Sequence, residues 1–106
     1  EMFATLGIAD LVRAKSRMIP AEPVGQVVAR GDAAIGFQQL SELRPVPGID
    51  VVGLIPPPVQ KITLFAGGVV ANAAHPAAAR ALLAYLAAPA AAPVISATGL
   101  QPVSSP

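Results

Sequence analysis

Residues 27–43 read VVARGDAAIGFQQLSEL, and this stretch decides the predicted fold class. Its apolar residues recur with helical spacing as far as Gly31, and a glycine at that point is typical of a helix end. A short pattern typical of a buried strand follows over residues 32–37, and polar residues come directly after it. Open α/β sheets bind ligands beyond the ends of their strands. The stretch therefore predicts an α/β protein with a ligand site near the polar residues that follow this strand.

The rest of the chain intermixes helical and strand patterns. Strand patterns lie at residues 18–20, 32–37, 49–55 and 61–73. Helical patterns lie at residues 2–12, 23–30, 77–86 and 90–98. Prolines mark helix starts, because Pro23 and Pro76 suit the first helical turn and Pro89 separates the last two helices. This mixed order favours an α/β fold over an all-α or all-β fold.

The composition excludes several classes of function. Of 106 residues, 54% are hydrophobic and 12% are charged, and the formal net charge is +1. This leaves no basic surface for nucleic acid or for an anionic membrane. The absence of cysteine excludes disulfides, thiolate metal sites and a thiol nucleophile. No charged residue follows Arg80, but prolines and a glycine interrupt that apolar run, so we do not expect a transmembrane helix.

No motif in the sequence indicates catalysis or metal binding. His75 is the single histidine, and its place before Pro76 at a helix start favours a capping or surface role. The six acidic residues include no pair spaced three or four apart, so no paired acid and base is indicated. Gly67-Gly68 lacks a phosphate-binding motif and is interpreted as a strand bend or hinge. We predict no catalytic residue, no metal and no cofactor.

Two positions carry neutral groups that suit an anion. The helix start at residues 21–24 leaves backbone N–H groups unpaired, and the positive end of the helix dipole favours negative charge. Gln38 and Gln39 supply amide donors and acceptors after the strand, although the residues alone favour a simple polar turn there. Ligand binding and simple structural roles both remain open on this reasoning.

Motifs along nearly the whole chain resemble those of one protein family. They are GIAD at 7–10 with Lys15, the stretch at 27–43, VPGIDVVGLIPPPVQKITLFAGGVVANA at 46–73 and HPAAARALLAYLAAPAAAPVISATGL at 75–100. Together they resemble the extracytoplasmic solute-binding proteins of ABC transporters, specifically the molybdate-binding-like branch with the type II periplasmic-binding fold. The resemblance covers about the C-terminal half of a typical family member.

The resemblance implies two α/β lobes joined by two crossing strands. Residues 1–54 would form part of the second lobe, with the ligand-facing helix start and strand. Residues 55–106 would supply the hinge return, a returning strand and the C-terminal helices of the first lobe. The first-lobe wall of the site has no counterpart in this sequence. We therefore expect either a missing N-terminal half or a homodimer that exchanges elements.

The resemblance also implies a function in import. The protein would capture a small anion, either a molybdate-like oxyanion or an organic carboxylate, between its lobes in the periplasm. It would then dock on an ABC permease in the membrane, and it would not be an enzyme. The ligand-binding residues implied are Ala21, Glu22, Pro23, Val24, Gln38 and Gln39.

One departure from the family pattern suggests an alternative function. Molybdate binders of the family often carry a tyrosine where this chain has Gln39, and the change admits an organic carboxylate as ligand. The alternative is an enzyme similar to aconitate isomerase on the same scaffold. Such an enzyme needs a proton-transfer residue, and the candidates in this chain are Glu22, Glu42 and Lys61.

Overall fold

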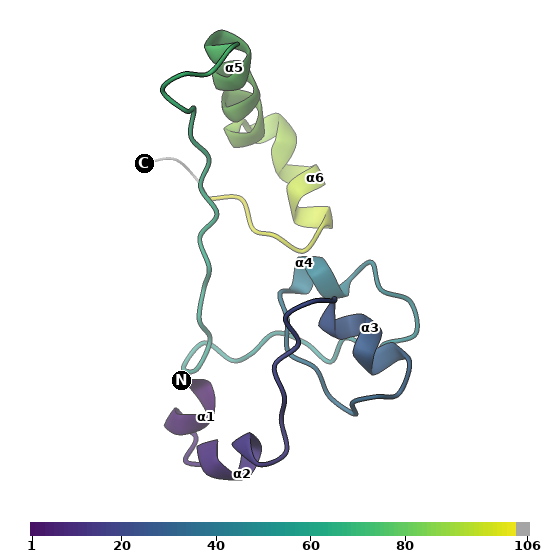
Figure 1. Cartoon of the computed structure of the whole chain (residues 1–106). Coiled ribbons are helices and arrows are strands. Elements are labelled where there is room, and N and C mark those ends of the chain that lie inside the picture. The colour runs from purple at the N-terminus through teal and green to yellow at the C-terminus, as the bar shows by residue number, and fades with distance from the viewer. Residues whose placement is uncertain (104–106) are drawn as a thin grey trace. The chain divides into compact units, whose positions relative to one another are not determined.

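The computed structural model describes residues 1–103, and its regular elements are short helices (Figure 1). Along these residues lie α1 Met2–Thr5, α2 Ala9–Arg13, α3 Val24–Ala29, α4 Leu40–Leu43, α5 Pro76–Ala87, the 3-10 helix η1 Pro89–Ala91 and α6 Ala92–Ala97. The chain divides into two units, Glu1–Thr63 with α1 to α4 and Leu64–Pro106 with the other helices. The predicted lobe boundary after residue 54 concerns a larger two-lobed protein and stays a prediction.

Helix α3 ends at a glycine, as its sequence predicts. Gly31 has a φ of +86°, in the left-handed region that glycine adopts without strain. Its N–H donates to the Val28 carbonyl at 2.9 Å, and the Asp32 N–H donates to the Val27 carbonyl at 3.1 Å. This pair of bonds is the Schellman motif, which satisfies carbonyls that the last helical turn leaves free. The chain therefore leaves α3 in a defined direction.

The first unit packs around the inner face of α3. Val27 is only 1% exposed and is the largest fully buried side chain of the described residues. Two glycines allow close packing at this helix, Gly25 within α3 and Gly36 after it. A Cβ on Gly25 would lie 3.0 Å from Val46 Cγ2, and a Cβ on Gly36 would lie 2.6 Å from Val24 Cγ1. Residues 36 and 46 are therefore held against α3 at distances that a larger side chain would prevent.

The N-terminal helices are joined to this packing by an aromatic contact. The rings of Phe3 in α1 and Phe37 lie edge to face, with centroids 5.6 Å apart and planes at 80°. In α2, Arg13 Nη1 donates to Asp10 Oδ1 at 3.0 Å, but both side chains are largely exposed. The phenylalanine pair is therefore the contact that ties α1 to the segment after α3.

Prolines set the helix bounds of the second unit, as predicted. His75 is the N-cap of α5, and Pro76 is the first helical residue. Pro89 begins η1, which leads directly into α6. A Cβ on Gly67 would lie 2.5 Å from Leu83 Cδ2, so the chain at residue 67 passes close to α5.

No single helix within residues 1–103 has the length and apolarity needed to cross a membrane. Pro76–Ala87 and Pro89–Ala97 satisfy those criteria only when taken together, and they are bent by 63° at the break between them.

The predicted strands do not form within the described residues. Segments 18–20, 32–37, 49–55 and 61–73 have no regular hydrogen-bonded pairing there, in contrast to the sequence prediction. A strand places its backbone donors and acceptors on a neighbouring strand, so an apolar pattern alone cannot complete one. Apolar side chains in these segments are therefore exposed to solvent, Val52 to 102% and Ile62 to 83%. The α/β class therefore stays a prediction.

Candidate functional site

The start of α3 is capped by a side chain from far along the chain. Its N-cap is Pro23, whereas the sequence predicts this proline as the first helical residue. Proline has no side-chain oxygen that could accept a hydrogen bond from the helix. Instead, the Val24 N–H donates to Gln38 Oε1 at 2.9 Å, in a part-buried contact across 14 residues. Because a backbone N–H can only donate, the Gln38 atom that it contacts is the amide oxygen and not the amide nitrogen.

This bond gives Gln38 a fixed orientation. Because its oxygen accepts from α3, the amide nitrogen keeps two hydrogens for other acceptors, and the described residues supply no partner for it. The bond also occupies the Val24 N–H, which the family resemblance implied as a ligand donor. The arrangement thus presents a side-chain amide, rather than the backbone of α3, as the donor at this position.

An open concavity of about 470 Å³ lies beside this contact in the first unit. Its wall combines three prolines with three polar side chains and one valine: Pro23, Gln26, Gln38, Glu42, Pro45, Val46 and Pro47. Proline fixes its own backbone φ, so much of the wall is conformationally stiff. The polar groups are two amides and one carboxylate, and no cation is among the lining residues. Such a wall offers neutral amide donors to a ligand, beside a carboxylate whose charge no lining cation offsets.

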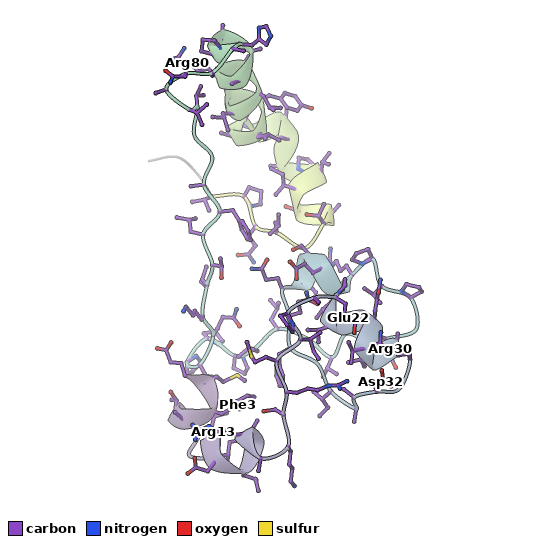
Figure 2. All side chains as sticks on the ribbon, viewed as in Figure 1. Phe3, Arg13, Glu22, Arg30, Asp32 and Arg80 are labelled. Atoms are coloured by element: carbon purple, nitrogen blue, oxygen red, sulfur yellow. The ribbon has the colours of Figure 1, made fainter. Side chains whose placement is uncertain are left out.

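Ion pairs connect Glu22, which precedes α3, with Arg30 at the C-terminal end of the helix, and Arg30 also pairs with Asp32. Arg30 donates from Nη1 and Nη2 to the two carboxylate oxygens of Glu22, at 2.6 and 2.7 Å, and from Nε to Asp32 at 2.5 Å. Figure 2 shows these three side chains together beside α3. The hydrogen bonds from Arg30 lower the pKa of both carboxyl groups and raise the pKa of the guanidinium.

The structure brings some of the predicted ligand residues together and separates others. Pro23 and Gln38 line the concavity, whereas Glu22 is held by Arg30 and Ala21 is exposed. Gln39 is the N-cap of α4, and its carbonyl accepts from the N–H groups of the last two residues of that helix. Binding by these six residues stays a prediction.

Two polar lining residues, Gln26 and Glu42, are outside the predicted ligand set. Gln26 follows Pro23 by three residues on a helix, a spacing that places both on one face and could have identified it. Glu42 was considered only as a proton-transfer candidate. A second concavity, of about 280 Å³, is lined by Leu40, Arg44, Val51, Gly53 and Leu54 and is mainly apolar.

Comparison with known proteins adds evidence that the geometry alone does not contain. Residues 1–101 match the family described as bacterial extracellular solute-binding protein. An aconitate isomerase from a Pseudomonas species is 59% identical over 102 residues, which cover 96% of this chain and 39% of that relative. The chain therefore spans less than half the length of the relative that it matches. No solved structure matches the chain.

The named relative overturns two predictions. We expected a solute-binding component of an importer, and we expected it not to be an enzyme. The similar protein is named as an isomerase, which contradicts both expectations and agrees with the alternative considered from the sequence. The chain matches the solute-binding family and is also similar to a protein named as an isomerase, so motifs of the scaffold could not separate the two functions.

Proposed function

Because the chain belongs to the family of bacterial extracellular solute-binding proteins, and because its relative there is an enzyme, we propose that it is part of an aconitate isomerase. The observation that carries this proposal is the 59% identity over almost the whole chain. The substrate is then a propene tricarboxylate, which the enzyme converts between its cis and trans forms. The family is extracellular, and we place this protein in the periplasm.

The fold that we propose for the whole protein is the two-lobed type II periplasmic-binding fold, with this chain as its C-terminal part. The relative is much longer than the chain, which leaves room for a first lobe. Exposed apolar side chains support the proposal, because Val52, Ile62 and Leu64 lie in extended segments that need strand partners. Strands from the remaining part of the protein would pair with these segments and bury them. Docking on a permease remains a prediction from the resemblance.

The proposed reaction demands two things of a site. Rotation about a carbon–carbon double bond is blocked, but moving a proton from the adjacent methylene carbon to the far alkene carbon shifts the bond and permits the geometry to change. The site must therefore hold three carboxylates in place and provide a group that moves one proton. This chain contributes amide donors in a stiff concavity, as Gln26 and Gln38 show.

The experiment uses the protein at the full length of its relative. Purified protein is incubated with cis-aconitate and separately with trans-aconitate, and both isomers are followed by proton NMR. We expect each to be converted to the same equilibrium mixture. Citrate, which has no double bond, is the control and should not change. Stabilisation of the protein by an aconitate isomer without any turnover would contradict the proposal and leave a binding protein.

A further inference from the structure

We infer that Glu42 is the catalytic residue that moves the proton, an assignment that rests on the proposed isomerase function. Proton abstraction beside a carboxylate group needs a base within reach of the substrate carbon. All six acidic side chains lie in the first unit, at residues 1, 10, 22, 32, 42 and 50. The structure separates these six by their partners and by their position relative to the two concavities.

Three of the acidic residues are already engaged by arginines. Glu22 and Asp32 both accept from Arg30, and Asp10 accepts from Arg13. For Glu22 the bidentate bond lowers the pKa of the carboxyl group, which weakens it as a base. A proton-transfer role would require Glu22 to give up this arrangement, so the structure disfavours the first of the candidates found in the sequence.

The other candidates lack a surrounding site. Glu1 and Asp50 line neither concavity, and neither does Lys61, which follows a turn in an extended and exposed segment. His75 begins α5 in the other unit and lines neither concavity. Glu42 is the one acidic residue in the wall of either concavity.

The neighbours of Glu42 suit a carboxylate substrate without disabling the base. Gln38 shares the concavity, and its amide hydrogens are available because its oxygen is held by the Val24 N–H. Gln26 adds a second amide on the same wall. Neutral amides can donate to a substrate carboxylate without forming an ion pair with Glu42, whereas a lining arginine would form one. Glu42 is exposed, as Lys61 is, but it lies in the wall of the concavity, and its side chain has no ion-pair or hydrogen-bond partner among residues 1–103.

A single carboxyl group can both remove and return the proton in this step. The Glu42 carboxylate takes a proton from the methylene carbon of aconitate, and the C–H electron pair spreads over the three-carbon allyl unit. The same carboxyl group then returns the proton to the other end carbon, and the electron pair forms the new C–H bond there. The double bond has moved by one position, its geometry is set by the bound conformation, and Glu42 is again ionised. No oxidant, reductant or second substrate is consumed.

The test compares wild type, Glu42→Gln and Asp50→Asn at the full length of the protein. Asp50→Asn removes an acidic residue of the same unit from outside both concavities. Isomerisation is measured in D2O by NMR, together with deuterium uptake into aconitate and thermal stabilisation by trans-aconitate. We expect Glu42→Gln to lower kcat about 10²–10⁴-fold, the usual range for a lost general base, and to retain stabilisation by trans-aconitate. Asp50→Asn should match wild type.

The outcomes separate this assignment from the proposed function. A wild-type protein that isomerises aconitate while Glu42→Gln retains full turnover would overturn the role of Glu42 alone. A wild-type protein without turnover would overturn the isomerase itself. If Glu42→Gln folds but no longer binds trans-aconitate, Glu42 is a binding residue and the inference fails. If Glu42→Gln is unfolded, Glu42→Asp decides: a shorter base should lower kcat at least tenfold with KM changed less than threefold, and an unchanged kcat would refute the assignment.

Discussion

Two valines of this chain have opposite surroundings. Val27, in helix α3, is 1% exposed, whereas Val52, in an extended segment, is fully exposed. Helix α3 satisfies most of its backbone within itself, so it needs only residues close in sequence, such as Gly36 and Val46, to pack against it. The extended segment needs a second strand before its side chains can be buried. The difference teaches that local patterns form structure here only where the backbone partners are local too.

The largest expected effect comes from exchanging these two valines for alanine. Val27→Ala removes two buried methyl groups and should lower the free energy of unfolding by about 2–3 kcal/mol. Val52→Ala should change it by less than about 0.5 kcal/mol in the isolated 106-residue chain. Urea unfolding followed by circular dichroism measures both.

The same pair tests the proposed strand partners. In a protein of the relative's length, Val52→Ala should become destabilising by about 1–2 kcal/mol, because a buried strand would cover Val52. An unchanged effect at that length would remove the support that exposed apolar segments give to the two-lobed fold.

A smaller effect is expected where the chain crosses α3 closely. Gly36→Ala should cost about 1–2 kcal/mol, since its Cβ would lie 2.6 Å from Val24 and 2.9 Å from Val28. Gly68→Ala is the matched control, because a Cβ there meets nothing within 4 Å. Thermal unfolding of the two variants measures the difference. Equal melting temperatures would show that residue 36 does not pack against α3 as described.

The smallest effect concerns acid sensitivity. The pKa values of Glu22 and Asp32 are lowered in the folded chain, so their contribution is present above their unfolded pKa values and is lost as the pH falls through the folded ones. Arg30→Gln should therefore reduce the loss of stability on acidification below roughly pH 4. Urea unfolding at pH 7 and pH 3 measures this loss, with Arg80→Gln of the other unit as control. An identical pH dependence in Arg30→Gln and wild type would contradict the role of these ion pairs.

The sequence predicted the helices far better than the strands. Gly31, Pro76 and Pro89 mark helix boundaries through their own backbone preferences, and the structure confirms each of them. The strand segments have the right composition, but pairing depends on residues distant in the sequence or outside it. Local signals could identify the type of a segment but not the partner that completes it.

The candidate site was predictable only in part for the same reason. Pro23 and Gln38 were expected at a ligand site, and both line the concavity. The use of the Val24 N–H by Gln38 depends on a contact across 14 residues, which no local pattern reveals. The capture of Glu22 by Arg30 likewise joins residues eight apart. Long-range hydrogen bonds thus decided which of the predicted groups stay available.

The hydrogen bond from Val24 to Gln38 also makes one backbone amide a natural reporter. Any ligand that drew the Gln38 side chain away would expose the Val24 N–H to solvent, and its hydrogen exchange would accelerate. A ligand that held the amide nitrogen of Gln38 in place would slow the same exchange. The hydrogen-exchange rate of the Val24 N–H, at the start of the six-residue helix α3, would therefore report whether a ligand displaces or holds Gln38.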